Sequence, residues 1–450
     1  MKKLLPLFIS AALGSMSTAA WADSLAEIYD LAKQNDPQLL SVAAQRDQAF
    51  EAINSSRSAL LPQINLTAGY DITRGDRDQD LGGKVSTDQN VLSAGVGFTQ
   101  ELYNRASWIT LDTAEKTARQ SDATYAATQQ GLILRVSQAY FEVLRAQDNL
   151  VFVRAEKAAV GRQLEQTKQR FEVGLSAITD VHDAQAQFDA VLADEVLAEN
   201  DLINSYESLR EITGQEHKNL NVLDTARFSA SRPSTPAETL VEEAKTTNLS
   251  LLSARISQDI ARDNISLASS GHLPTLSLDG GYNYADTAES INDNTADGFN
   301  VGVNLAVPLY TGGRTTSEVK QAEYSYVAAS ENLEAEYRSV VKEVRAQNNN
   351  INASIGALKA YEQSVVSAQS ALEATEAGFD VGTRTIVDVL DATRRLYDAN
   401  KNLSDARYNY ILAGLQLRQA VGTLSEQDIL DVDAGLKQQN KRLSNTKNAS

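Results

Sequence analysis

Two kinds of hydrophobic pattern run along the chain, one with a period of two residues and one with the period of a helix. Alternation occurs twice before residue 104 and twice between residues 274 and 309. From Ile64 to Ile72, for example, every second residue is apolar and the residues between are polar or small. Period two predicts strands of about 9 to 11 residues, the length that a tilted strand needs to cross a bilayer. We therefore expect two strand hairpins, at 62–101 and 274–309, with polar loops at 73–90 and 285–298.

The spans 103–172 and 313–380 contain no proline and are rich in Ala, Gln, Glu, Arg, Leu and Val. Because proline costs about 3 kcal/mol inside a helix, each span is free to form one continuous helix. About seventy residues at ~1.5 Å each give a helix of roughly 100 Å, which is deeper than any globular core. These helices must therefore pack against neighbouring helices as coiled coils. A shorter helix should begin with Asp36 as its N-cap and Pro37 at its first position, and end near Ala59.

The two halves of the chain repeat one pattern. Gly174 matches Gly382, and Gly214 matches Gly422, both at an offset of 208 residues. A repeat that extends over the whole chain is an architecture rather than a local motif. The division that it predicts is a first repeat at 23–214 with a turn at 173–176, a linker region at 215–247, a second repeat at 248–436 with a turn at 381–384, and a polar, disordered tail at 437–450.

The first 22 residues have the pattern of a secretory signal, with Lys2 and Lys3 before an apolar run and Ala-Trp-Ala before Asp23. Without them the chain keeps 39 basic and 59 acidic residues, a net charge of −20 that argues against nucleic acid as a partner. The chain has no cysteine, so it has no disulfide and no thiol nucleophile. No later segment approaches 18 consecutive apolar residues, so we expect no membrane-spanning helix.

Four strands cannot close a barrel, and in lipid each unpaired backbone group costs several kcal/mol. At least eight strands are needed, so a membrane sheet would require a dimer with eight strands or a trimer with twelve, and the residues do not decide between them. Aromatic residues near the strand ends fit an interfacial girdle. The alternative is an ordinary sheet packed on the helices, since aromatic residues also favour strands. The small, polar opposite faces favour the membrane hypothesis, because a water-filled lumen requires them.

The signal, the hairpins, the Leu-Pro before each hairpin and the two turn sequences together resemble the TolC family of outer-membrane efflux channels, or outer membrane factors. The turn sequences are Arg170-Phe-Glu-Val-Gly-Leu and Gly378-Phe-Asp-Val-Gly-Thr-Arg-Thr-Ile-Val-Asp-Val-Leu-Asp. The likeness covers the mature chain to about residue 435. It implies an α+β, mostly α fold with four transmembrane β-strands per protomer in a 12-stranded trimeric barrel, and a long α-helical coiled-coil tunnel across the periplasm. The linker region would lie at the equator of this tunnel.

The resemblance implies an outer-membrane homotrimer that extends into the periplasm and performs no catalysis. It would export drugs and small toxic compounds from an inner-membrane RND, ABC or MFS pump through a periplasmic adaptor protein, with no cofactor and no bound metal. The resemblance also allows proteins as cargo. An iris-like gate at the periplasmic end would open when the coiled coils untwist. The tips that match the adaptor-docking turns of the family are formed by Val173, Gly174, Leu175, Val381, Gly382 and Thr383.

The resemblance also assigns residues to the gate by position. In a trimer, Asp388 and Asp391 would form a ring of six carboxylates. Arg384 would bond towards Thr179 and Asp180 across the coiled coils, and would help to hold the gate closed.

Similar proteins carry tyrosine where this chain has Phe379. Its hydroxyl link to the facing helices is therefore missing here, and we expect the closed state to be held less tightly.

The residues themselves also allow a structural interpretation of this acidic segment. Thr385 and Asp388 have the spacing of a capping box, and acids in the first turn of a helix complement its dipole. Both roles can coexist, because capping uses local backbone donors and leaves the charge free. At the matching position, Ala177 replaces the threonine, which weakens the capping explanation for Asp180. Arg384 alone could be a solvated turn residue.

Other functions have less support in the sequence. The three histidines, at 182, 217 and 272, lack metal-ligand spacing, and no nucleophile and base are paired, so an exported enzyme has no candidate site. A non-conducting coiled-coil tether or surface adhesin with a barrel anchor remains the alternative. It predicts no conductance and no effect of substituting Asp388.

Overall fold

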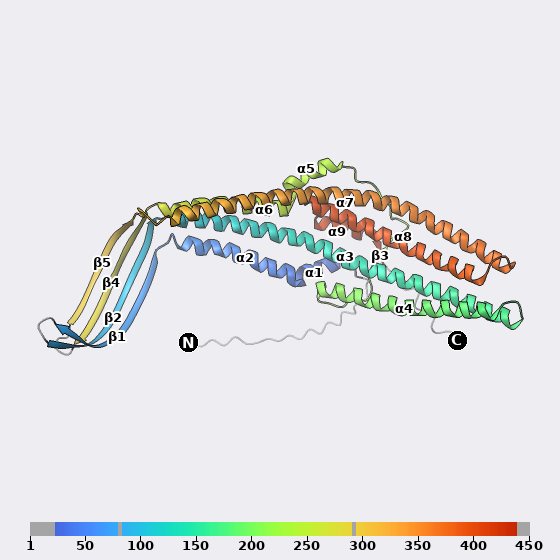
Figure 1. Ribbon diagram of the computed structural model, residues 1–450, viewed down its shortest axis with the longest axis horizontal. Coiled ribbons are helices and arrows are strands. Elements are labelled where there is room, and N and C mark those ends of the chain that lie inside the picture. Colours follow the sequence, from blue (N-terminus) through green and yellow to red (C-terminus); the bar gives the residue numbers. More distant parts are fainter. Residues whose placement is uncertain (1–22, 80–82, 290–293, 439–450) are drawn as a thin grey trace, which may run out of the picture.

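The computed structural model describes residues 23–79, 83–289 and 294–438 of the 450-residue chain. The expected signal at 1–22 and the expected tail from residue 439 onward lie outside the described residues. The molecule is elongated, with a four-stranded sheet at one end and long helices that run from it to the other end (Figure 1). No helix in the described ranges combines the length and apolar character needed to cross a membrane.

Four strands form the sheet in the order β1-β2-β4-β5, and neighbouring strands are antiparallel. The predicted strand length of 9 to 11 residues is wrong, because the strands contain 17, 21, 15 and 13 residues. Pairing continues into the segments expected to be polar loops, for example between Thr73 and Gln89 and between Ala285 and Ala296. Backbone pairing does not require apolar side chains, so the period-two pattern marks only part of each hairpin. The strands are β1 (Gln63–Gln79), β2 (Gly83–Tyr103), β4 (Thr275–Glu289) and β5 (Asn294–Ala306).

One face of the sheet carries large apolar side chains that no other described part of the chain covers. Leu66 is 78% exposed and Phe299 is 85% exposed. Among the described residues, the strands make their substantial contacts with other strands, and the sheet extends beyond the helices (Figure 1). The alternative of an ordinary sheet packed on the helices is therefore wrong.

The long helices agree with the proline-free spans. The helix α3 (Arg105–Glu172) has 68 residues and α7 (Arg314–Asp380) has 67, as predicted for 103–172 and 313–380. Each is followed by a 36-residue helix that packs back on it, α4 (Ile178–Thr213) on α3 and α8 (Ile386–Val421) on α7. The chain thus forms two helical hairpins, α3–α4 and α7–α8, whose tips lie at the end opposite the sheet (Figure 1).

Shorter helices complete the half of the molecule nearer the sheet. The helix α2 (Pro37–Ser58) packs on α3, and α6 (Leu249–Ser269) packs on α7. The Asp36 side chain accepts a hydrogen bond from the Leu39 amide at 2.9 Å, which confirms the predicted cap and the start of α2 at Pro37. The other elements are α1 (Leu25–Asn35), β3 (Val222–Leu223), α5 (Ala237–Thr247), η1 (Ser270–His272), α9 (Glu426–Asp433) and β6 (Leu436–Lys437).

The largest apolar core lies midway along the molecule, where α1, α3, α4, α8 and α9 meet. Tyr140 and Phe141 are completely buried there, with ring centroids 5.8 Å apart in an edge-to-face arrangement. At the edge of this core β3 pairs with β6, and the Lys437 ammonium lies 3.0 Å from Asp224. Lys437 is therefore ordered, which corrects the expectation that the disordered tail begins at this residue. The linker region likewise contains β3 and α5.

A glycine in the left-handed conformation follows each of α4 and α8, but the two have different surroundings. Gly214 has φ 71°, and a Cβ there would meet nothing closer than 4.0 Å. Gly422 has φ 92°, and a Cβ there would lie 2.5 Å from the Thr247 carbonyl oxygen. The turn between α5 and α6 holds this end of α8, since Thr247 Oγ1 donates to the Val421 carbonyl at 2.6 Å.

Gly422→Ala should therefore destabilise the protein more than Gly214→Ala. Both changes carry the left-handed penalty of about 1–2 kcal/mol, but only the first also displaces backbone. Urea unfolding of the mature protein in detergent, followed by circular dichroism, measures both. Equal losses for the two variants would contradict the close packing at Gly422.

A half-buried carboxylate makes the helical packing sensitive to pH. Partial burial, together with the nearby charges of Asp398 and Asp194, raises the pKa of Glu156 on α3 from 4.5 to about 7, although the Arg394 charge opposes them. Above pH 7 the folded state keeps the Glu156 carboxylate ionised in surroundings that disfavour its charge. Between about pH 7 and 4.5 the folded state takes up a proton before the unfolded state does, so this penalty decreases as the pH falls.

Glu156→Gln should consequently raise the free energy of unfolding by on the order of 1 kcal/mol at pH 8, and by much less at pH 5. Glu172→Gln, at an exposed position of the same helix, provides the control. Urea titrations at the two pH values measure the effect. A gain of the same size at both would exclude the ionisation of Glu156 as its cause.

Candidate functional site at the helical tips

The two helical hairpins end in turns of the same geometry. Gly174 and Gly382 have φ 78° and 80°, a conformation that glycine adopts without strain. The Leu175 amide donates to the Arg170 carbonyl, and the Thr383 amide donates to the Gly378 carbonyl, each at 2.8 Å. This is the Schellman pattern, which satisfies the last carbonyls of a helix.

These turns leave apolar side chains in solvent. Val173, Leu175 and Val381 are 70%, 76% and 75% exposed. Apolar residues at a protruding tip form a small surface that a partner could cover. Gly174, Gly382 and Thr383 are exposed beside them.

The start of α8 is capped by the residues that the sequence indicated. The Thr385 side chain accepts from the Asp388 amide at 3.2 Å, and Asp388 Oδ2 accepts from the Thr385 amide at 2.9 Å. These bonds confirm the capping box. The hydrogen bonds from Thr385 lower the pKa of Asp388, and the Arg384 charge adds to the effect, so this carboxylate stays ionised at neutral pH. Asp391, one turn further on, is exposed and makes no hydrogen bond or ion pair within the described part of the chain.

Asp180 caps the matching helix despite the loss of the threonine. Its Oδ2 accepts from the Ala177 amide at 3.1 Å and from the Ser176 hydroxyl at 2.7 Å. Ala177 therefore removes only one of the two hydrogen bonds of a capping box, the one that the N-cap side chain would accept. Thr179 is exposed next to it.

One chain does not bring Arg384 together with Thr179 and Asp180. Within the described ranges, the Arg384 side chain makes no hydrogen bond or ion pair with either residue. It folds back over its own turn instead, since a Cβ on Gly378 would lie 2.7 Å from Arg384 Cγ. The link expected across the coiled coils is therefore absent within the protomer, and it stays a prediction for contacts between protomers.

Phe379 lies half-buried between the two helical hairpins, among apolar side chains of both. The Arg170 guanidinium lies over its ring, 4.5 Å from the centroid, and is 3.5 Å from the Asp380 carboxylate. Sequence reasoning gave no role to Arg170. One feature of the sequence could have indicated a role for Arg170: the matching position of the second repeat is a glycine, Gly378.

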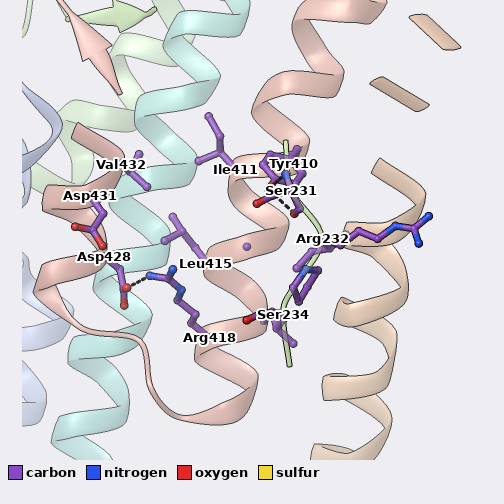
Figure 2. Close-up of a pocket in the computed structure, with 14 residues that line it drawn as sticks. Ser231, Arg232, Ser234, Tyr410, Ile411, Leu415, Arg418, Asp428, Asp431 and Val432 are labelled. Carbon is purple, nitrogen blue, oxygen red and sulfur yellow. Dashed lines mark hydrogen bonds and ion pairs between the residues drawn. The ribbon is translucent and has the colours of Figure 1, made fainter. Parts of the chain in front are cut away.

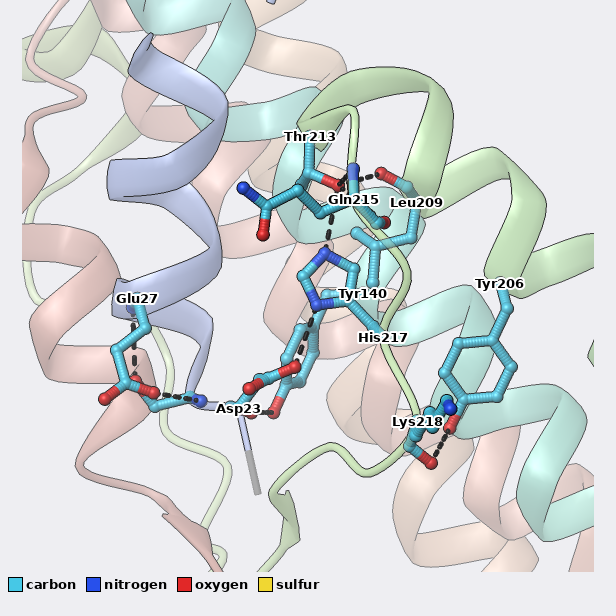
Figure 3. A network of polar contacts seen from close by, with 10 residues as sticks. Asp23, Glu27, Tyr140, Tyr206, Leu209, Thr213, Gln215, His217 and Lys218 are labelled. Atoms are coloured by element: carbon cyan, nitrogen blue, oxygen red, sulfur yellow. Dashed lines mark hydrogen bonds and ion pairs between the residues drawn. The ribbon is translucent and has the colours of Figure 1, made fainter. Parts of the chain in front are cut away.

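A separate polar network joins Asp23 to the end of α4 and to the segment that follows it (Figure 3). The His217 side chain is 5% exposed, and its two ring nitrogens lie 2.8 Å from Asp23 Oδ2 and 2.9 Å from Thr213 Oγ1. The Tyr140 hydroxyl donates to the Asn221 carbonyl at 2.7 Å. This network fixes the first described residue against the end of α4, which is a structural role. His182 and His272 are exposed, and no group of metal-ligating side chains occurs in the described residues.

The segment that follows β3 borders a cavity of about 520 Å³ beside α8 and α9 (Figure 2). Tyr410 holds this segment, because its hydroxyl accepts from the Ser231 amide at 3.0 Å and donates to the Ser231 carbonyl at 2.9 Å. Arg418 and Asp428 form an ion pair at the opposite side. The lining does not pair a nucleophile with a base, so the cavity offers no catalytic arrangement.

Comparison with known proteins agrees with this architecture. The family model described as "Outer membrane efflux protein" matches residues 28–215 and 240–423. The chain is 75% identical to the outer membrane protein TolC of Vibrio cholerae serotype O1, over 97% of this chain and 99% of that protein. It is 47% identical to the TolC of Escherichia coli K12, over 97% of this chain and 90% of that protein.

Similarity in structure extends to proteins of much lower identity. The crystal structure of the Campylobacter jejuni CmeC outer membrane channel superposes with a TM-score of 0.76 at 16% identity, covering 97% of this chain and 98% of that one. At this identity the match supports the fold alone. The family match and the two close relatives decide the classification: the protein belongs to the outer membrane efflux protein family, a family of transport channels of the outer membrane rather than of enzymes.

Proposed function

We propose that this protein assembles as a homotrimer that forms a passive export duct. Three four-stranded sheets would join into a 12-stranded barrel in the outer membrane, and the helices would enclose a tunnel across the periplasm. The observation that carries the proposal is the uncovered apolar face of the sheet, which includes Leu66 and Phe299. Such a face requires lipid, because water would leave a large apolar surface exposed.

The edges of the sheet support assembly. The strands β1 and β5 each pair on one side only within the described chain. In lipid these edges must find partners, and β1 of one protomer joined to β5 of the next would satisfy both. The helices support the same assembly, because α4 exposes Val196, Leu197 and Ile203 along its length. We retain the division into repeats at 23–214 and 248–436 as part of this proposal.

The tips would form the gate and the docking site. Three copies of Asp388 and Asp391 would surround the axis as a ring of carboxylates, which attracts cations. Arg384 of one protomer would bond to Thr179 and Asp180 of another and hold the ring closed. The exposed Val173, Gly174, Leu175, Val381, Gly382 and Thr383 would dock a periplasmic adaptor protein.

The duct itself would perform no catalysis. An inner-membrane RND, ABC or MFS pump would supply the energy and deliver drugs and small toxic compounds, and the same duct would allow proteins as cargo. Adaptor binding at the tips would shift the helices between two packings, which opens the gate in the manner of an iris.

Current measured across planar bilayers tests the duct and its acidic constriction. The wild type should give a small, cation-selective conductance, and Asp388→Asn with Asp391→Asn should lose most of the selectivity in a salt gradient. Asparagine keeps an oxygen that can accept the Thr385 bond, so the cap survives while the charge is lost. Asp201→Asn with Glu211→Gln, two exposed acids of α4, removes the same charge far from the tips as a control. If well-folded, inserted protein is silent with and without the substitutions, the duct is wrong, and the non-conducting tether or adhesin becomes the better account.

Arg384→Ser should make the gate leak, because a serine cannot reach across to the neighbouring coiled coil. Cells that carry it should become several-fold more sensitive to a large antibiotic that the intact outer membrane excludes. Arg395→Ser, at an exposed position of α8, serves as the comparison. Unchanged sensitivity at equal expression would show that Arg384 is only a solvated turn residue.

A further inference from the structure

The last turn of α3 contains an arginine that contacts the other helical hairpin. The Arg170 side chain is 28% exposed, and its guanidinium lies 4.5 Å from the centroid of the Phe379 ring. A terminal nitrogen of the same group lies 3.5 Å from the Asp380 carboxylate, which is 65% exposed. Phe379 and Asp380 are the last two residues of α7. One side chain therefore connects the ends of both long helices.

The ring that Arg170 covers occupies the junction between the helical hairpins. On one side Phe379 packs against a cluster that includes Val160 of α3 and Ala184 of α4. On the other side it packs against a cluster that includes Leu372 of α7 and Leu396 of α8. Phe379 is thus the apolar contact that both clusters share, and Arg170 closes over it from the α3 side.

Between the helical hairpins, the next hydrogen bonds and ion pairs lie far from the tips. Arg145 bonds to Asn409 at 2.8 Å and pairs with Asp405 at 3.3 Å, and Asp148 accepts from Tyr408 at 2.8 Å. From Asp148 to Arg170 the helix rises by roughly 33 Å. Within the described residues, no hydrogen bond or ion pair joins the helical hairpins along this length until Arg170 is reached. Apolar packing predominates there, and the half-buried Glu156 lies near the charges of Asp398 and Arg394.

We propose that Arg170 is a clasp that holds the two helical hairpins of each protomer in their closed packing. This inference rests on the proposed gate and names a residue that controls it. Arg170 lies three residues before Val173, and Phe379 lies two residues before Val381, so a partner that covers the exposed tips would bind beside the clasp. A cation over an aromatic ring at a partly exposed site is a weak interaction, which docking can break.

The clasp also changes the expectation for Phe379. A tyrosine hydroxyl is missing at this position, but a cation over the ring needs only the ring face. Arg170 therefore provides a link between the helical hairpins that does not depend on the hydroxyl.

A double-mutant cycle tests the clasp in the full-length mature protein. Arg170→Gln removes the cation, and Phe379→Leu keeps an apolar side chain but removes the ring face. Each alone should raise the open probability of single channels about two- to fivefold, the range expected from one weak cation–aromatic contact. Together they should have little more effect than either alone, because both remove the same interaction. Arg119→Gln, at an exposed position of α3 far from Phe379, should leave the open probability unchanged.

A second measurement does not depend on current. Hydrogen exchange of the last turn of α7 should be faster in Arg170→Gln and in Phe379→Leu than in the wild type, and unchanged in Arg119→Gln. Additive effects of the two substitutions, or unchanged exchange in Arg170→Gln, would overturn the clasp. If the wild type carries no current but the variants differ from it in hydrogen exchange as expected, the duct is wrong, and the contact between Arg170 and Phe379 is still established.

Discussion

The need to cover the apolar face and the two open edges of the four-stranded sheet constrains the rest of this protein. One chain can cover neither the apolar face nor the edges by itself, because the helices begin where the strands end and extend away from the sheet. Water would leave the side chains of Leu66 and Phe299 exposed, and lipid would leave the edges of β1 and β5 unpaired. Assembly of several protomers in a membrane covers the apolar face with lipid and pairs the edges of the sheets. The number of protomers then also sets the number of helices that extend from the barrel.

The helices meet a related constraint in water. A helix of 68 residues has no deep core to enter, so α3 and α7 are stabilised along their length by small apolar clusters. The largest core forms only midway, where α1, α8 and α9 add side chains around Tyr140 and Phe141. Towards the tips the apolar clusters are smaller, with six and four buried residues against twenty in the central core. A region held by smaller clusters suits the proposed gate, which requires two packings of similar energy.

Local signals in the sequence predicted much of this fold. Asp36 with Pro37, Thr385 with Asp388 and the two turn glycines act within a few residues, and each has the expected role. Strand length was wrong because the polar residues at 73–79 pair as well as the apolar ones. Arg170 was missed because its partners are more than 200 residues away in the sequence. Its contact with Phe379 depends on how two helical hairpins pack, which no local pattern encodes.

The two tips have the same backbone geometry but different side-chain contacts. Their turns share the same hydrogen bonds and the same glycine conformation. Three residues before the C-cap of the long helix, the first copy has Arg170 and the second has Gly378. The arginine reaches to the neighbouring helical hairpin, whereas the glycine leaves room for Arg384 to fold over its own turn. Arg384 thereby remains unpaired within the described part of its own chain, as its proposed bond to a second protomer requires, whereas Arg170 makes its contacts inside the protomer.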